Sequence, residues 1–156
     1  MKLSVLEYLQ HQAAGTLTDE METHLRYPTA ISQKLNMHIA AVELGIATVE
    51  IEADAVIHGN QQGTVHGGLI TELADAAIGT AHSTLIEPDQ SFTTIELKIN
   101  FYRPVWKSKL SATARPLQSG KTITHYSCEV KNQEGKVVAM ANSTVMTLYG
   151  DRAAGR

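Results

Sequence analysis

Two carboxylates lie one helical turn apart near the middle of the chain, shortly after a pair of glycines that could begin a helix. The carboxylates are Glu72 and Asp75, and the glycines are Gly67 and Gly68. Free N–H groups at a helix N-terminus bind anions and stabilise an oxyanion that develops during acyl transfer. A carboxylate activates water or attacks a carbonyl carbon directly. These residue types in this order are ones that acyl-transfer chemistry can use.

The residues around the carboxylates have helical spacing from about Gly67 to Leu85, and Pro88 closes the segment. One side of this helix is apolar. The other side carries small and polar residues without any lysine or arginine: Gly68, Thr71, Glu72, Asp75, Gly79 and His82. A solvated helix face normally carries long charged side chains, and each glycine inside a helix costs about 1 kcal/mol relative to alanine. The stripe predicts close packing against another helix or subunit, against a ligand, or against both where they meet.

The spacing of the two groups sets a limit on how one chain can use them. Gly67 and Asp75 are separated by about 12 Å of helix at about 1.5 Å per residue. This distance is too long for both to touch the same substrate atom within one chain. A second copy of the chain would be needed to complete a site.

The rest of the sequence predicts a sheet around this helix. Alternating apolar residues predict strands at residues 37–42 and 47–53, and then at about 92–103, 109–117, 122–131 and 137–148. Strands that cluster after a helix and are joined by tight turns favour an antiparallel sheet in an α+β fold. Two short helices are expected before the sheet, at residues 3–14 and from about 18 to 26.

Composition excludes several classes of protein. The 156 residues suffice for one domain with its own core, and the net charge of −3 excludes a nucleic-acid binder by charge. No apolar run approaches the roughly 20 residues that span a membrane. Polar residues that begin at Glu7 interrupt the N-terminal apolar stretch, which argues against a signal peptide. The single cysteine, Cys128, is expected to be buried in a strand, and the expected location is the cytoplasm.

The segment from Asn60 to Asp75 resembles the hotdog-fold acyl-CoA thioesterases of the PaaI-type, phenylacetate-pathway branch. That family's pattern is N-x-x-G-x-x-H-G-G followed by L-A-D, and the chain has both parts at the same spacing. The strand from Thr94 to Pro104 is also similar to the family's strand after the helix. The resemblance covers about residues 35–148. It implies a hotdog domain over residues 35–149, with an N-terminal helical extension over residues 1–34 and a short tail over residues 150–156.

The hotdog fold is a curved antiparallel sheet, here of about six strands, wrapped around a long central helix. The resemblance also implies a homodimer or homotetramer with active sites at the dimer interface. Such an assembly would bring Gly67 of one chain to Asp75 of another.

The resemblance gives each candidate catalytic residue an expected role. Asp75 is the nucleophile or the general base that activates water, and the N–H of Gly67 forms the oxyanion hole. Asn60 either binds the thioester carbonyl or holds the loop as a turn residue. His66 orients the loop or the carbonyl, or is a structural histidine. Thr94 lies near the water, on a strand face shared with Glu96 and Lys98.

The expected substrate-binding residues are Gly68, Glu72, Ile78, Arg103 and Lys121. Glu72 is also the reserve carboxylate for the reaction, and Ile78 would line the acyl pocket. The histidines have no metal-ligand spacing, so we expect no metal, and no cofactor apart from the CoA of the substrate.

Two other functions are compatible with a hotdog domain. One is a non-catalytic acyl-CoA sensor, but residues 1–35 are not basic enough for the DNA-binding segment that such a sensor usually carries. The other is a dehydratase or hydratase, whose histidine and acid occur in a different pattern. The combination of Asp75, Asn60 and Gly67 favours hydrolysis.

Overall fold

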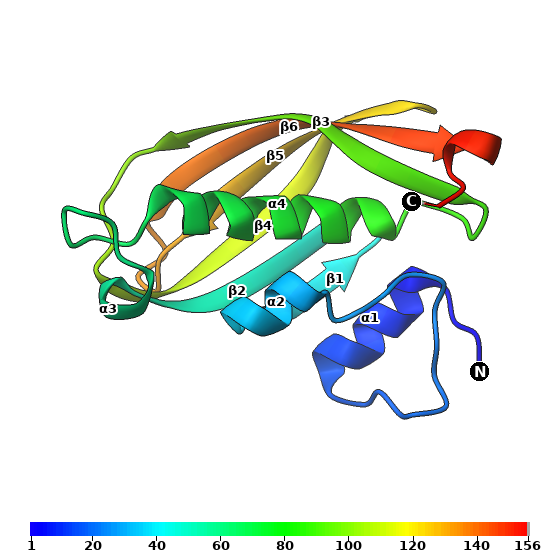
Figure 1. Cartoon of the computed structure of the whole chain (residues 1–156), viewed down its shortest axis with the longest axis horizontal. Helices are drawn as coiled ribbons and strands as arrows, with labels where there is room; N and C mark the ends of the chain where they lie inside the picture. Colours follow the sequence, from blue (N-terminus) through cyan, green and yellow to red (C-terminus); the bar gives the residue numbers. More distant parts are fainter. Residues whose placement is uncertain (156) are drawn as a thin grey trace.

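A curved antiparallel sheet wraps around one long helix in the computed structural model, which describes residues 1–155 (Figure 1). The strands are β1 (His38–Glu43), β2 (Ile46–Asp54), β3 (Gln90–Phe101), β4 (Lys107–Ser119), β5 (Ile123–Lys131) and β6 (Val137–Tyr149). They form a 6-stranded sheet in the order β1-β2-β4-β5-β6-β3, so that β1 and β3 are its edges. The predicted α+β architecture is therefore confirmed.

The long helix is α4 (Gly67–Ser83), and it lies across the concave face of the sheet (Figure 1). Its apolar side is buried against the strands, and Leu73, Ala77 and Ile78 have no exposed surface. The shorter helices are α1 (Val5–Ala14), α2 (Ala30–Leu35) and α3 (Ala55–His58), followed by a 3-10 turn, η1 (Gly150–Arg152). The alternation that predicted the sheet and the period that predicted α4 both locate these elements to within a few residues.

The prediction of a helix over residues 18–26 is wrong. The N–H of Leu3 donates to the carbonyl of Glu22 at 2.8 Å, and the N–H of Glu22 donates to the carbonyl of Met1 at 3.0 Å. This stretch therefore pairs with the start of the chain instead of with itself. The helix that does form, α2, begins later, where the Thr29 hydroxyl accepts a hydrogen bond from the N–H of Ser32 and caps its N-terminus.

Helix α1 belongs to the same core as the sheet. Ser4 and Glu7 form a capping box at its start, and Gly15 ends it with a positive φ of 68°. Its inner face buries Val5 and Leu9, which join the strands and α4 in one hydrophobic cluster. Helix α1 is thus packed against the sheet and α4.

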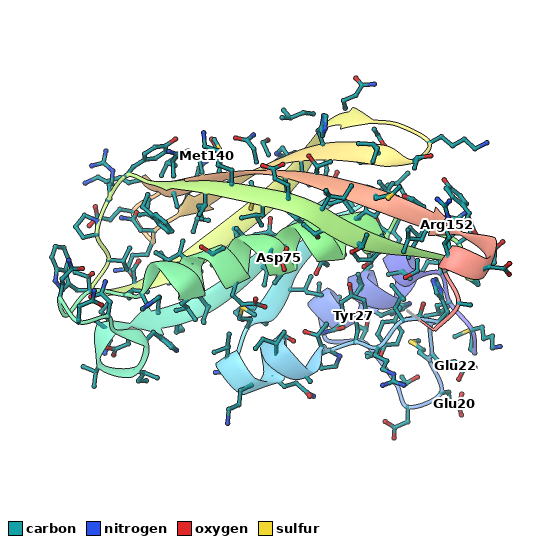
Figure 2. All side chains as sticks on the ribbon, turned by 45° about the horizontal axis from the view of Figure 1, so that its top comes forward. Glu20, Glu22, Tyr27, Asp75, Met140 and Arg152 are labelled. Carbon is teal, nitrogen blue, oxygen red and sulfur yellow. The ribbon has the colours of Figure 1, made fainter. Side chains whose placement is uncertain are left out.

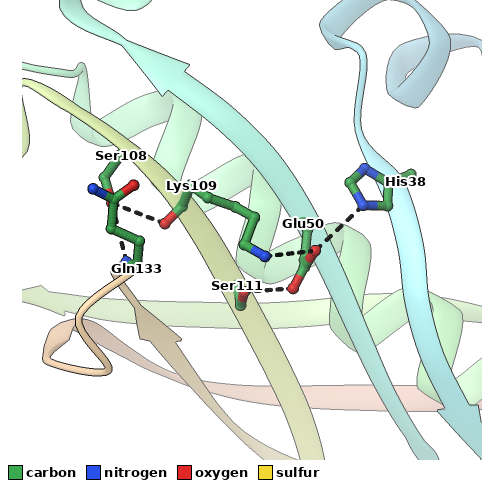
Figure 3. A network of polar contacts seen from close by, with 6 residues as sticks. All are labelled: His38, Glu50, Ser108, Lys109, Ser111 and Gln133. Atoms are coloured by element: carbon green, nitrogen blue, oxygen red, sulfur yellow. Dashed lines mark hydrogen bonds and ion pairs between the residues drawn. The ribbon is translucent and has the colours of Figure 1, made fainter.

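A polar network fixes the register of three strands on the face of the sheet away from α4 (Figure 3). The Glu50 carboxylate lies 3.3 Å from His38 Nε2 and 3.7 Å from Lys109 Nζ, and it accepts a hydrogen bond of 2.8 Å from Ser111. Farther along β4, Ser108 accepts a hydrogen bond from the N–H of Gln133. Because a slip of one residue would turn Glu50 into the core, the network favours a single pairing of β1, β2 and β4.

Two observations concern features outside the candidate site. Within residues 1–155, no helix is long and apolar enough to cross a membrane. Cys128 is free and fully buried on β5. Burial raises the pKa of its thiol to about 12, so the thiol stays protonated and behaves as a small apolar group.

Candidate active site

The loop before α4 is organised by the side chain of Asn60. Its Oδ1 accepts hydrogen bonds from the N–H groups of Gln62 at 2.9 Å and Thr64 at 3.1 Å. Its Nδ2 donates to the hydroxyl of Thr64 at 2.9 Å. Of the two interpretations of Asn60, loop support is therefore visible in the structure. The second hydrogen on Nδ2 is a donor that a substrate carbonyl could use.

His66, Gly67 and Gly68 form the start of α4. His66 is the N-cap, and its Nδ1 accepts a hydrogen bond of 2.8 Å from the N–H of Gly68, so the proton of the neutral ring is on Nε2. A Cβ on Gly68 would lie 2.9 Å from that Nδ1, and a Cβ on Gly67 would lie 3.0 Å from the ring of Phe101. A side chain at Gly68 would therefore have to displace the His66 ring, and one at Gly67 the Phe101 ring. Within residues 1–155, the N–H of Gly67 makes no hydrogen bond and is available to a ligand.

The loop and the helix start face a cleft of about 330 Å³. Asn60 and Gly67 line one side, and the segment after β3 that contains Arg103 lines the other. The structure thus brings together three of the predicted site residues. This cleft combines backbone and amide donors with a guanidinium group, which suits an oxyanion and a phosphate.

Asp75 lies in a different cleft, of about 210 Å³, halfway along α4 (Figure 2). Glu72, Ala76 and Gly79 share its α4 wall, and Phe92 lines it from β3. Burial raises the pKa of the Asp75 carboxyl above its usual value. Burial, and then the charge of Asp75, raise the pKa of Glu72. A carboxylate with a raised pKa is a stronger base, which suits proton abstraction from water.

The two clefts share no lining residue. The Gly67 N–H and the Asp75 carboxylate therefore lie in separate clefts, in agreement with their separation of about 12 Å along the helix. Each cleft contains one part of the chemistry that the sequence predicts.

Thr94 lies on the opposite strand face from the one predicted. A bulge between Thr94 and Glu96 shifts the register of β3 against β6. Thr94 pairs with Val145, which is fully buried under α4, whereas Glu96 pairs with Thr144 and accepts a hydrogen bond from its hydroxyl. Because paired residues point to the same side of a sheet, Thr94 faces α4, as does Phe92 in the Asp75 cleft. The bulge places this hydroxyl on the Asp75 side of the sheet.

Three predicted substrate-binding residues line neither cleft: Gly68, whose N–H is bonded to His66, together with Ile78 and Lys121. Ile78 is fully buried in the core and does not line the Asp75 cleft. At about 100° per residue it lies about 60° to one side of Asp75, whereas Glu72 and Ala76, which line the cleft, lie on the other side. The neighbour four residues after Asp75, Gly79, lines the cleft in its place. Lys121 lies in the turn between β4 and β5, where its carbonyl accepts a hydrogen bond from Tyr149, near the far end of α4.

The N-terminal segment also contributes to the Asp75 cleft, which the sequence patterns do not predict. Tyr27 and Ser32 line it opposite α4. The sequence held one signal, a tyrosine next to Pro28 in a mostly polar connection. Long-range packing places that tyrosine against the helix, and no local pattern shows such packing.

Comparison with known proteins shows the family to which the chain belongs. Residues 62–139, half of the chain, match the family model of the thioesterase superfamily. The chain is 27% identical over 117 residues to the 1,4-dihydroxy-2-naphthoyl-CoA hydrolase of Listeria monocytogenes, which covers 74% of this chain and 93% of that protein. It is 26% identical over 134 residues to the medium/long-chain acyl-CoA thioesterase YigI of Escherichia coli, which covers 77% of this chain and 86% of that protein.

A solved structure is similar over nearly the whole chain. The E. coli PaaI protein, from the phenylacetic acid degradation operon, superposes with a TM-score of 0.74 at 26% identity and covers 94% of this chain and 98% of its own. Together these matches confirm the resemblance that the segment from Asn60 to Asp75 indicates. The chain belongs to the thioesterase superfamily, and its class of reaction is thioester hydrolysis.

Proposed function

We propose that this protein hydrolyses acyl-CoA thioesters to a free acid and CoA at sites that two copies of the chain form together. The observation that carries the proposal is the arrangement of α4 in a member of the thioesterase superfamily. Its N-terminus offers the unused N–H of Gly67, and its middle offers the half-buried carboxylate of Asp75. The relatives named above act on CoA thioesters, which supports CoA as the carrier group.

The reaction follows from these groups. The Gly67 N–H and the amide of Asn60 bind the thioester oxygen and stabilise the negative charge that develops on it. Asp75 takes a proton from water as the water oxygen bonds to the carbonyl carbon, or it attacks that carbon itself. The C–S bond then breaks, and the departing CoA thiolate receives that proton from Asp75. If Asp75 attacks the carbon itself, an anhydride of Asp75 and the acyl group forms, and its hydrolysis by water releases the free acid, restores the carboxylate and supplies the proton for the thiolate. Thr94, on the Asp75 side of the sheet, is a candidate to hold the water.

The CoA portion is expected in the cleft that contains Arg103, whose guanidinium suits phosphate groups. No cofactor takes part in this scheme. Within residues 1–155, no cluster of three or more histidine, cysteine or acidic side chains is arranged to hold a metal ion. A free, protonated Cys128 is compatible with the reducing cytoplasm, which we propose as the location.

Strand β3 supports the shared site. It is an edge strand, and Ile95 on it is 56% exposed at the bulge. An unpaired edge with an exposed apolar residue is a template for pairing with another chain. Antiparallel pairing of two β3 strands would place two α4 helices side by side in opposite directions, with Gly67 of each near Asp75 of the other. We therefore propose a homodimer. A homotetramer would consist of two such dimers.

The direct test of the activity is thiol release from a panel of acyl-CoAs that includes short, long and aromatic acyl groups. We expect release of one free thiol per acyl group, well above the rate without protein. A rate equal to background on the whole panel would exclude the enzyme and favour an acyl-CoA-binding module.

A mixing experiment tests the shared site. Asp75→Asn and Asn60→Ala each impair one half-site, and a heterodimer of the two variants contains one intact site. Coexpression is expected to restore about a quarter of the wild-type rate, because half of the dimers are mixed and each has one good site of two. Mixed samples no more active than the sum of the separate variants, or a monomeric mass by light scattering, would contradict the shared site.

A further inference from the structure

The N-terminal segment forms one wall of the Asp75 cleft. The Tyr27 hydroxyl donates a hydrogen bond of 2.8 Å to Ser83 Oγ, and the Ser83 hydroxyl donates one of 2.7 Å to the carbonyl of Gly79. These bonds hold Tyr27 against the last two turns of α4, beyond Asp75 (Figure 2). Burial also raises the pKa of the Tyr27 phenol, so it remains a neutral hydrogen-bond donor.

This wall is anchored to the core. Leu9 of α1 is fully buried with the sheet residues, and Tyr8 donates a hydrogen bond of 3.4 Å to the carbonyl of Tyr27. The segment that precedes Tyr27 is tied back to the chain start through Glu22. Because several separate contacts hold the segment, Tyr27 is a fixed boundary of the cleft.

On α4, the wall of the cleft has no side chain at Gly79. A Cβ on Gly79 would have a single neighbour within 4 Å, Cε2 of Phe92 at 4.0 Å, which is an ordinary contact. Unlike Gly67 and Gly68, this glycine has no neighbour in the chain that a side chain would have to displace. The volume that a side chain would occupy here belongs to the cleft.

The dimensions of the cleft limit what it can hold. From Asp75 to Thr80, the last α4 residue that lines it, five residues of helix span about 7.5 Å. The volume of 210 Å³ exceeds the roughly 150 Å³ of a protein cavity known to bind benzene. An acyl group the size of one aromatic ring with a short linker, or a medium-length chain, fits between Asp75 and Tyr27.

We propose that Tyr27 and Gly79 set the upper size limit of the acyl group, with Tyr27 as the end wall and Gly79 as the open side of the cleft. The inference rests on the proposed function, because it takes Asp75 as the position of the thioester. It assigns the N-terminal segment a role in specificity. Acyl groups longer than the distance to Tyr27 are excluded.

The test compares kcat/KM for acetyl-, octanoyl- and palmitoyl-CoA. The wild type is expected to prefer octanoyl-CoA over palmitoyl-CoA. Tyr27→Ala is expected to raise the palmitoyl value at least about tenfold, and Gly79→Val to lower the octanoyl value about tenfold with little effect on acetyl-CoA. Tyr27→Phe loses the bond to Ser83 but keeps the ring that blocks the cleft, so its palmitoyl value is expected to stay well below that of Tyr27→Ala. The two substitutions are expected to shift the preferred acyl-chain length in opposite directions, which a general loss of folding cannot do.

Binding of non-hydrolysable thioether analogues with the same acyl groups, measured by calorimetry, separates this inference from the proposed function. Length-dependent binding that Tyr27→Ala relieves, in a protein without hydrolysis, would support the size limit and reject the enzyme. If the wild type, Tyr27→Ala and Gly79→Val all hydrolyse acyl-CoAs with the same dependence on chain length, the size limit is overturned and the proposed thioesterase activity stands. A protein that neither binds the analogues nor hydrolyses acyl-CoA would overturn both the size limit and the proposed function.

Discussion

Replacement of Asp75 by asparagine is expected to lower kcat for acyl-CoA hydrolysis by about 10²- to 10⁴-fold, the usual contribution of a general base. Asparagine has nearly the same shape, so the cleft keeps its volume, but the amide cannot accept the proton from water or attack the carbonyl carbon. Binding of the acyl group is retained, and KM is expected to change little. Thiol release under saturating substrate measures the effect.

Glu72→Gln is the matched control, since it removes a carboxylate one turn away in the same cleft. Its effect on kcat is expected to be much smaller. A loss of activity in Glu72→Gln together with normal activity in Asp75→Asn would reverse the assignment of the two carboxylates.

The pH profile provides a second measurement of Asp75. The reactive form is the carboxylate, so activity is expected to rise with pH through the pKa of Asp75 and to be lost as pH falls below it. Burial puts this pKa above the ordinary aspartate value of 3.8. The acid limb of kcat/KM is therefore expected above pH 3.8, at a position that Glu72→Gln moves little because burial is the cause of the shift.

The parts of the fold that are encoded locally could be predicted from the sequence. The period of α4 and the alternation in β2 are repeated patterns, so the elements were located to within a few residues. The pairing of Glu22 with the first residues of the chain depends on contacts far apart in sequence, and the turn-and-acid pattern of residues 18–26 was misread as a helix. The bulge at Ile95 left no local signal, which is why Thr94 was placed on the wrong face.

The candidate site divides in the same way. The N-cap and close-packing requirements at His66, Gly67 and Gly68 restrict those positions to particular residue types, so the order of residues alone reveals a helix start. The residues that line the Asp75 cleft are not restricted to particular types in this way. Tyr27 reaches the helix through tertiary packing, which no local pattern shows. On α4, the sequence predicts Ile78 as a cleft residue where the structure has Gly79, because a helical wheel fixes only an approximate angle.

His82 shows a further limit of the wheel. It falls on the polar stripe, yet it is only 1% exposed and lies between two strands' hydroxyl groups. Its Nδ1 is 2.9 Å from the hydroxyl of Tyr126, and its Nε2 is 2.9 Å from that of Thr147. A neutral imidazole has one donor and one acceptor, so it satisfies both hydroxyls, whereas the protonated ring would have two donors in a buried position.

Acidification from pH 6.5 toward pH 4 is expected to lower the free energy of unfolding by about 3 kcal/mol through His82 alone. Burial lowers the pKa of His82 from 6.5 to about 4 in the folded protein, so in this window the unfolded chain takes up a proton that the folded chain refuses. Stability from this group is complete above pH 6.5 and is lost as pH falls, until the folded protein is protonated near pH 4.

Urea unfolding of the wild type and His82→Gln between pH 4 and pH 8 isolates this contribution. Glutamine can donate to one hydroxyl and accept from the other, and it does not titrate. The carboxylates, including the raised pair of Asp75 and Glu72, are present in both proteins and cancel in the difference. The wild type is expected to be the more stable protein at pH 8, and its advantage is expected to shrink steadily below pH 6.5. An advantage that stays constant across the range would mean that His82 takes up its proton equally in the folded and unfolded states, which its burial between Tyr126 and Thr147 forbids.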